Sequence, residues 1–259
     1  MGVVNVTPDS FSDGGCFADP ARALAHARRL RDDGADVLDV GGESTRPGAA
    51  PVGEAEEMDR VLPLVEALAG DGALVSVDTM KPRVMRAAIA AGAAMVNDVR
   101  ALQAPDALAA VAEASVAVCL MHMQGEPRSM QAAPRYDDVV AEVRGFLGDR
   151  AQACQAAGIA RERIVLDPGF GFGKTTEHNF TLLRDLRCLV DAGYPVLAGW
   201  SRKSSLGAVT GRPVGERLAG SLAAALYAVT QGAVLVRVHD VRETVDALKV
   251  WEAARRGRV

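Results

Sequence analysis

The chain has 259 residues, of which 49% are hydrophobic and 24% charged, and its formal net charge is −4. This composition excludes disordered, collagen-like and coiled-coil proteins, and the near-balanced charge argues against a nucleic-acid partner. Four cysteines without a CxxC pair, a start without the apolar run of a signal peptide, and no apolar window long enough to cross a membrane predict a cytoplasmic protein with free thiols.

Short runs of β-forming residues alternate along the chain with longer Ala-rich runs of helical period. The predicted strands are residues 2–6, 37–42, 74–79, 95–99, 117–122, 164–169, 196–201 and 235–240. The predicted helices are residues 21–33, 54–69, 82–91, 105–114, 136–157, 177–192, 215–231 and 241–255. The strands are almost continuously apolar, which is typical of parallel strands covered on both faces.

Eight strand–helix units in succession predict an α/β fold. We expect a single-domain (β/α)8 TIM barrel that spans residues 1–259. The alternative is a doubly wound sheet with the same number of units. That fold would need a long crossover connection at a switch point, and no segment is obviously reserved for one.

Each predicted strand ends in polar residues that a buried strand has no packing reason to carry. In a barrel, the carboxyl ends of all strands meet on one face, where the active sites of such barrels lie. One polar residue at a strand end is usually a turn or helix-cap residue, but eight such ends in register predict a common site. Its candidate members are Asn5, Thr45, Arg46, Asp78, Asn97, His122, Asp167, Lys203, Arg237 and His239.

The last two units carry cationic side chains. Barrels often bind phosphate at the loops after strands seven and eight, and arginine offers a planar fork that suits phosphate oxygens. The position therefore predicts a phosphate site, while the alternative is surface ion pairing with Asp240 or Glu216. The cationic residues are Arg202, Lys203, Arg237 and His239.

Hydrogen-bond acceptors lie across the expected mouth, at Asp78, Asn97 and Asp167. Metal binding by all three is disfavoured, because Asn is a weak ligand and no histidine lies beside them. A carboxylate is well satisfied by two adjacent N–H donors, and the edge of an aminopyrimidinone offers that geometry. The pattern therefore favours a pterin or a purine-like heterocycle, without deciding between them.

Residues 168–175 are rich in glycine but fail two phosphate-binding motifs. Pro168 stands where a P-loop needs its first glycine, and the dinucleotide-binding pattern lacks its third glycine. We interpret the stretch as a strand-to-helix loop in which Phe170 or Phe172 lines a pocket. Two other loops, 7–20 and 43–53, are longer than ordinary connections of this kind, and we expect them to close over a ligand.

Longer stretches of the chain match a known pattern, in order, over nearly its whole length. They are MGVVNVTPDSFSDGG at 1–15, DVGGESTRPG at 39–48, SVDT at 76–79, ND at 97–98, LMHMQG at 120–125, LDPGFGFGK at 166–174, SRKS at 201–204 and RVHD at 237–240. In these stretches the chain resembles the dihydropteroate synthase family. That family usually has a short segment before its first strand, whereas here the strand begins at residue 2. We expect this difference to affect stability more than chemistry.

The resemblance implies a transferase of folate biosynthesis with two small-molecule substrates. The amine of 4-aminobenzoate would displace the diphosphate of 6-hydroxymethyl-7,8-dihydropterin diphosphate, which gives 7,8-dihydropteroate and pyrophosphate. We expect an SN1-like displacement without a covalent enzyme intermediate, assisted by Mg²⁺. The resemblance also implies a homodimer, and the Ala- and Leu-rich segments 218–229 and 245–251 either form its interface or cover the barrel.

The resemblance also assigns roles to individual residues. The pterin diphosphate would be bound by Thr45, Asp78, Asn97, Asp167, Lys203, Arg237 and His239, between apolar walls supplied by Met121 and Phe172. The 4-aminobenzoate site would be bordered by Thr45, Pro47, Phe172 and Ser204. Catalytic roles fall to Arg237, His239, Lys203 and Arg46, and the metal ligand is Asn5.

Two other functions remain open. A methyltransferase domain that binds methyltetrahydrofolate would keep the acceptors but has no diphosphate to hold, so Thr45, Arg46 and the 201–203 motif argue against it. A non-catalytic pterin-binding paralogue is the second alternative. Release of pyrophosphate from both substrates would distinguish the expected enzyme from either.

Overall fold

A computed structural model describes residues 1–7, 20–44, 49–126 and 129–257. Within these residues, all eight predicted strands are present, and each lies inside its predicted range. They are β1 (Gly2–Asn5), β2 (Val37–Gly41), β3 (Leu74–Asp78), β4 (Met95–Asp98), β5 (Ala117–Met121), β6 (Ile164–Asp167), β7 (Leu197–Ala198) and β8 (Leu235–Val236).

The strands form a ring of parallel neighbours in chain order. Strands β1 to β6 make one six-stranded sheet, and β7 pairs with β8. Isolated parallel bridges join the two groups at both seams, from Leu166 to Val196 and from Gly2 to Val238. The ring explains why the strands are apolar on both faces, and the predicted TIM-barrel fold is confirmed.

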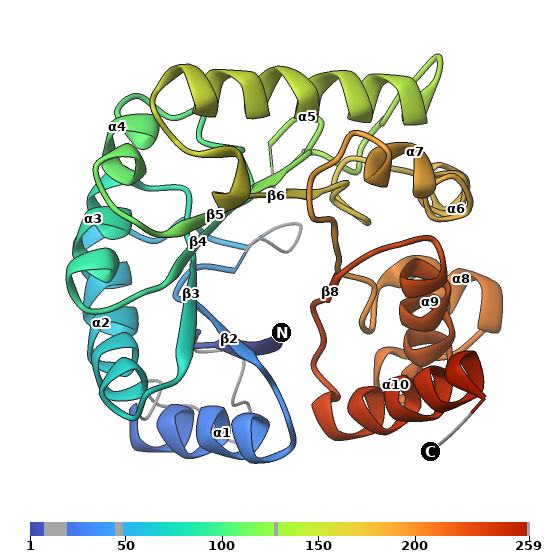
Figure 1. Cartoon of the computed structure of the whole chain (residues 1–259), viewed down its shortest axis with the longest axis horizontal. Helices are drawn as coiled ribbons and strands as arrows, with labels where there is room; N and C mark the ends of the chain where they lie inside the picture. The colour runs from blue at the N-terminus through green and yellow to red at the C-terminus, as the bar shows by residue number, and fades with distance from the viewer. Residues whose placement is uncertain (8–19, 45–48, 127–128, 258–259) are drawn as a thin grey trace.

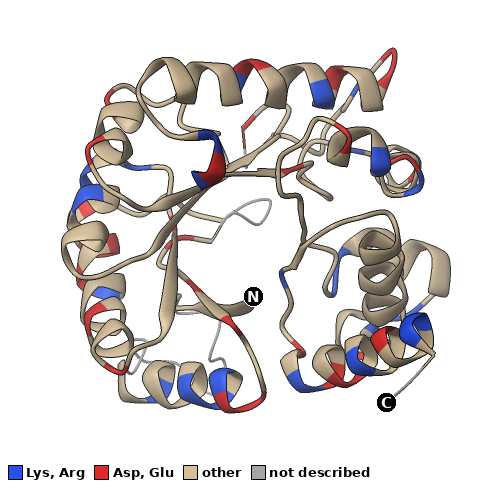
Figure 2. Cartoon of the chain, in the orientation of Figure 1, with Lys and Arg blue, Asp and Glu red and all other residues tan. Residues whose placement is uncertain are grey.

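Helices surround the strands, as Figure 1 shows. They are α1 (Pro20–Asp32), α2 (Glu54–Gly70), α3 (Pro82–Ala90), α4 (Ala107–Ala112), α5 (Val139–Ala156), α6 (Thr176–Arg184), α7 (Arg187–Val190), α8 (Ser204–Thr210), α9 (Leu218–Thr230) and α10 (Val241–Arg256). Basic and acidic residues are mixed along this outer layer (Figure 2). No helix among the described residues is long and apolar enough to cross a membrane.

Two helix predictions need correction. Residues 177–192 were expected to form one helix, but α6 ends at Arg184 and α7 begins at Arg187. The break turns Leu186 and Leu189 into the core, where they are 0% and 1% exposed. Helix α8 was not predicted, because its seven residues, SSLGAVT, carry almost no helical period.

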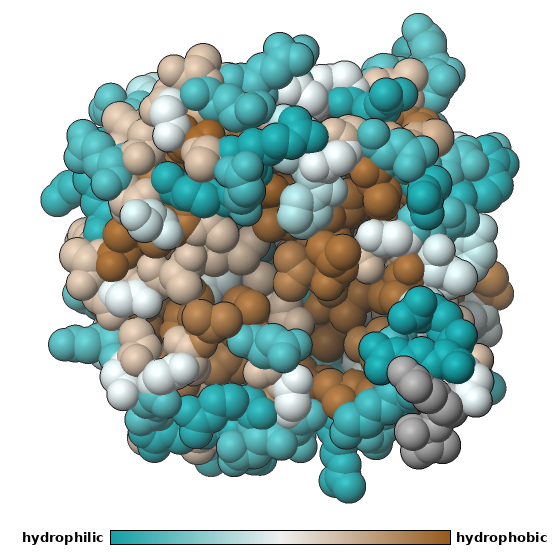
Figure 3. Space-filling view, viewed as in Figure 1, coloured by the Kyte–Doolittle hydropathy of each residue, from teal (hydrophilic) through white to brown (hydrophobic). Residues whose placement is uncertain are grey.

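The interior of the barrel is divided into an apolar half and a polar half. Near the amino ends of the strands it is filled by Met1, Met95, Cys119, Val165 and Leu197, and Figure 3 shows hydrophobic side chains at the centre of the face in view. Cys119 is fully buried there. Towards the carboxyl ends the inward side chains become polar, and the candidate site begins at that level.

Candidate active site

Arg237 joins the cationic side of the barrel mouth to the acidic side. Its Nε donates to Asp39 Oδ2 at 2.5 Å, and its Nη2 donates to Asp78 Oδ2 at 2.8 Å. Burial alone would lower the pKa of Arg237, but Asp39 and Asp78 outweigh that effect and raise it. The arginine is therefore a permanent, well-ordered cation at the centre of the mouth.

Asp39, at the centre of β2, was missed by the sequence analysis. Its side chain is fully buried, and Oδ2 also accepts a hydrogen bond from Asn97 Nδ2 at 3.2 Å. The available signal was a single carboxylate in the otherwise apolar strand segment Val37–Gly41. Such a residue is costly to bury without partners, so its presence indicates a site.

The three predicted acceptors lie on neighbouring or facing strands of the same mouth. Asp78 and Asn97 are register partners on β3 and β4, and Asp167 ends β6. Burial raises the pKa of Asp78 to about 7, although Arg237 opposes the shift. Burial also raises the pKa of Asp167, against the effect of Lys203. Both carboxyl groups are therefore poorly hydrated and suited to N–H donors of a ligand.

Lys203 lies beside the glycine-rich loop after β6. Its Nζ donates to the carbonyl oxygen of Phe170 and lies 4.6 Å from the centroid of the Phe172 ring. Burial lowers the pKa of Lys203 to about 8, against the opposing effect of Asp167. The structure thus brings Lys203 and Phe172 together, as the predicted site requires.

Lys174, in the same loop, cross-links backbone segments. It is 2% exposed, and its Nζ donates to the carbonyl oxygens of His122, Gly169 and Phe172 at 3.0 to 3.2 Å. It also lies 2.9 Å from His122 Nδ1, and burial together with Lys174 lowers the pKa of His122 to about 3. The neutral imidazole nitrogen is a fourth acceptor, so the three N–H groups of the lysine are shared among four acceptors. Lys174 thus cross-links the backbone instead of facing a phosphate group, which agrees with the failure of this loop to match the P-loop motif.

The remaining predicted members have different positions. His239 lies near Ser201, whose Oγ is 3.1 Å from the backbone nitrogen and 3.0 Å from Nδ1 of the histidine. Arg202 instead forms an ion pair with Asp240, with Nε 3.0 Å from Oδ2. For Arg202, therefore, the salt-bridge alternative is correct. Met121 ends β5 and is 4% exposed.

Asn5 is half-buried and Ser204 is exposed, both at the mouth side of the barrel. Asn5 ends β1 and Ser204 begins α8. A Cβ placed on Gly41 would lie 3.8 Å from Asn5 Oδ1 and 3.5 Å from Asp78 Cβ, so Asn5 and Asp78 flank the same backbone position. Thr45, Arg46 and Pro47 lie outside the described residues.

A second ionic cluster, also missed from the sequence, holds the beginning and end of the 43–53 loop. Lys81 donates to Glu43 Oε2 at 2.6 Å and to the fully buried Glu57 of α2. Glu43 Oε1 accepts from the backbone of Val52 at 3.0 Å. Burial would lower the pKa of Lys81, but the two glutamates raise it, so the lysine stays charged.

Comparisons with known proteins agree with the resemblance inferred from the motifs. The family model described as "Pterin binding enzyme" matches residues 1–239. Dihydropteroate synthase of Escherichia coli K12 is 52% identical over 254 residues, which cover 98% of this chain and 90% of that protein.

Solved structures give the same result. The structure of Xanthomonas albilineans dihydropteroate synthase with 4-aminobenzoic acid superposes with a TM-score of 0.93 at 56% identity, covering 98% of this chain and 92% of that one. The structure of the enzyme from the same organism in complex with 7,8-dihydropteroate superposes with a TM-score of 0.90 at 54% identity, with the same coverage.

Proposed function

Since the chain belongs to the family of pterin-binding transferases that includes dihydropteroate synthase, we propose that it catalyses the reaction of that enzyme. It joins 6-hydroxymethyl-7,8-dihydropterin diphosphate to 4-aminobenzoate and releases pyrophosphate. One structural observation supports this proposal independently of the similarity to known proteins. Arg237, from the region after β8, meets Asp39 and Asp78, which precede it by 198 and 159 residues, in one buried mouth.

The acceptor side of the mouth suits the pterin ring. Asp78, Asn97 and Asp167 accept N–H groups along the ring edge, and Lys203 donates to its carbonyl oxygen. Asn97 Oδ1 is buried and has no hydrogen-bond partner among the described residues, so a ligand donor would remove an energetic penalty. Met121 and Phe172 border the ring with apolar surface.

The cationic side suits the leaving diphosphate. Negative charge grows on the diphosphate as the bond from carbon to oxygen breaks, and Arg237, His239 and Arg46 stabilise it where it develops. The pterin methylene becomes cation-like, and the arylamine then attacks it in an SN1-like displacement. We expect no covalent enzyme intermediate, because the arylamine itself attacks the methylene. A pterin adduct on the protein, seen by rapid-mixing mass spectrometry, would contradict this mechanism.

Asn5 is the proposed protein ligand of Mg²⁺. Among the described residues, no three His, Cys, Asp or Glu side chains form a group that could hold a metal ion. A single amide oxygen at the mouth fits an ion that arrives with the substrate, because Mg²⁺ commonly keeps water and phosphate oxygens as its other ligands. When bound, Mg²⁺ neutralises charge on the diphosphate. Asn5 then orients that end of the substrate.

The 4-aminobenzoate site lies beside the pterin. Phe172 and Ser204 border it in the described part of the chain, and Thr45 and Pro47 are its proposed members from the loop 43–53. Phe172 contacts Lys203, so the two substrates share a wall. In this proposal, the amine of 4-aminobenzoate lies next to the pterin methylene.

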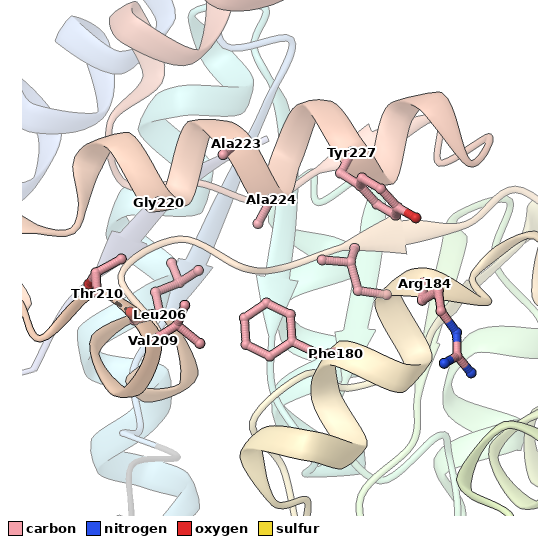
Figure 4. A pocket seen from close by; sticks show the side chains of 10 residues that line it. Phe180, Arg184, Leu206, Val209, Thr210, Gly220, Ala223, Ala224 and Tyr227 are labelled. Atoms are coloured by element: carbon pink, nitrogen blue, oxygen red, sulfur yellow. Dashed lines mark hydrogen bonds between the residues drawn. The ribbon is translucent and has the colours of Figure 1, made fainter.

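We also propose that the protein is a homodimer and that an apolar groove on its outer surface is the interface. Figure 4 shows this groove, which has a volume of about 380 Å³ and lies between α6, α8 and α9. Phe180, Leu206 and Tyr227 face one another across it. At its edge, Val209 and Tyr227 are 66% and 43% exposed, and a second copy would remove this apolar surface from water.

Sedimentation velocity tests the dimer with two matched variants. Val209→Glu places a charge in the groove, and we expect a monomer. Val234→Glu, just before β8, is the control, because Val234 is 68% exposed, does not line the groove and lies outside the candidate interface segments 218–229 and 245–251. A wild-type monomer, or a dimeric Val209→Glu protein, would refute this interface.

The activity is tested by a coupled assay for pyrophosphate, run with and without 4-aminobenzoate and Mg²⁺. We expect release that depends on both additions, with 7,8-dihydropteroate as the other product. A methyltransferase or a non-catalytic binding protein would bind pterin without releasing pyrophosphate. That result would refute the proposed function.

A further inference from the structure

Asp39 touches two proposed substrate-binding side chains but has no assigned role of its own. It is 0% exposed in the middle of β2, and one oxygen, Oδ2, accepts from both Arg237 Nε and Asn97 Nδ2. The other oxygen, Oδ1, is buried without a hydrogen-bond partner among the described residues. Burying a carboxylate in this way is costly, so stability alone gives no reason to keep it.

The contact with Asn97 determines which end of the amide faces Asp39. The oxygen and nitrogen of an amide are told apart by their hydrogen bonds, and an ionised carboxylate is only an acceptor. The Asn97 atom that lies 3.2 Å from Asp39 Oδ2 must therefore be the nitrogen. Asn97 Oδ1 consequently points away from Asp39, and it has no partner of its own in the described part of the chain.

The contact with Arg237 determines the plane of the guanidinium group. Asp39 on β2 binds Nε, and Asp78 on the neighbouring strand β3 binds Nη2. A guanidinium is planar, with its donors in a fixed fork, so two anchors on different strands leave one orientation. Backbone hydrogen bonds between β2 and β3 hold the two aspartates in place. The orientation of the Arg237 guanidinium therefore does not depend on a bound ligand.

We propose that Asp39 is the positioning residue of the pterin site: it turns the Asn97 amide so that its oxygen is offered to the ligand, and it holds Arg237 in plane. The inference rests on the proposed function and deepens it. It explains why the site selects a heterocycle whose edge donates hydrogen bonds. If the Asn97 amide could turn freely, it could bind a ring edge that donates hydrogen bonds or one that accepts them. The site would then no longer distinguish between the two kinds of ligand.

The first variant is Asp39→Asn, which keeps the volume of the side chain and removes its charge. We expect the KM for dihydropterin diphosphate, and the Kd for 6-hydroxymethylpterin measured by calorimetry, to rise about 10- to 100-fold. The KM for 4-aminobenzoate, measured at saturating dihydropterin diphosphate, should stay within about twofold. A merely structural role would not separate the two substrates.

Asp98→Asn is the matched control. Asp98 is also 0% exposed and lies on β4, but it accepts the backbone N–H groups of Arg100 and Leu102 at 2.8 Å. We expect this variant to lower the melting temperature and to leave both KM values within about twofold of the wild type. It shows what losing a buried carboxylate does when the site is not involved.

A double variant, Asp39→Asn with Asn97→Asp, exchanges donor and acceptor across the same pair. The amide at 39 can donate to the carboxylate at 97, whose second oxygen again offers an acceptor to the ligand. We expect pterin affinity about tenfold better than that of Asp39→Asn. The kcat should be low in both variants, because Arg237 keeps Asp78 but loses its bond to a carboxylate at position 39. Rescue of binding without rescue of turnover would support both parts of the proposal.

Three results would overturn the inference: Asp39→Asn binds pterin like the wild type, it changes both KM values in parallel as a destabilised protein would, or the double variant is no better than the single one. A wild-type protein that releases no pyrophosphate would refute the proposed function instead. The calorimetric titration needs no turnover, so it would still decide the role of Asp39.

Discussion

Among the glycines that the structure describes, Gly169 leaves the least room for a side chain. It follows Asp167 at the end of β6, with a φ of +67°, and a Cβ there would lie 1.9 Å from the carbonyl oxygen of His122. Carbon and oxygen atoms normally approach no closer than about 3.3 Å, so Gly169→Ala must push the two loops apart by about 1.4 Å. The left-handed backbone costs alanine about 1–2 kcal/mol, and the overlap adds about 1–3 kcal/mol.

Gly211→Ala separates these two costs. Gly211 ends α8 with a similar φ of +71°, but nothing lies within 4 Å of an added Cβ. We therefore expect this variant to lose only the backbone part, about 1–2 kcal/mol, whereas Gly169→Ala loses about 2–5 kcal/mol in total. Urea unfolding at equilibrium measures both values under the same conditions.

The Gly169 variant also affects the site. The backbone nitrogen of Gly169 donates to Asp167 Oδ1 at 2.7 Å, so displacement of the loop moves a proposed pterin-binding carboxylate. We expect weaker pterin binding in Gly169→Ala and unchanged binding in Gly211→Ala. Equal losses of stability in the two variants would refute the steric argument, and unchanged pterin binding would refute the link to Asp167.

Three further predictions concern charged residues. Arg237→Ala should lower turnover about 100-fold or more, because it removes charge stabilisation from the leaving group; near-normal turnover in the pyrophosphate assay would contradict the assignment. The kcat/KM for dihydropterin diphosphate should fall as pH rises through about 8, because the pKa of Lys203 is lowered to about 8 and the neutral amine is a weaker donor. Lys203→Arg keeps its charge at high pH, so this variant should retain activity there. If the wild type and Lys203→Arg lose activity at the same pH, Lys203 is not the group whose titration is observed. Lys174→Met should cost about 3–5 kcal/mol, because it leaves buried carbonyl groups without a donor; urea unfolding that shows a loss below about 1 kcal/mol would mean that the loops hold without it.

The likeness to known enzymes and the geometry support the proposed function in different ways. The family match establishes which kind of protein this is, because it extends over residues 1–239. The contacts in the structure then indicate which side chains of this protein form the site. They also change the sequence interpretation at Arg202, which forms an ion pair with Asp240. They add Asp39, which begins the 39–48 motif but had been given no role.

Local sequence was sufficient for the order of the elements. A strand such as β3 is apolar because both of its faces are covered, and a helix such as α3 begins at Pro82 and ends just before a glycine with positive φ, Gly92. These signals depend on neighbours a few residues apart, which is why all eight strands were predicted. The signal failed where burial overrides local period, as at Leu186, and where a helix is very short, as in α8.

The sequence by itself determined that eight strand–helix units follow one another and that polar residues stand at the carboxyl ends of the strands. It left a doubly wound sheet as the alternative, which the strand pairing excludes. Only the tertiary structure decided which of those residues touch. Arg237 reaches Asp39 across 198 residues of chain, and Lys174 binds a carbonyl group 52 residues away. The first contact arises because the closed ring brings the β8 region beside β1, the neighbour of β2, and the second because β5 and β6 are neighbouring strands. No local pattern of residues records either arrangement.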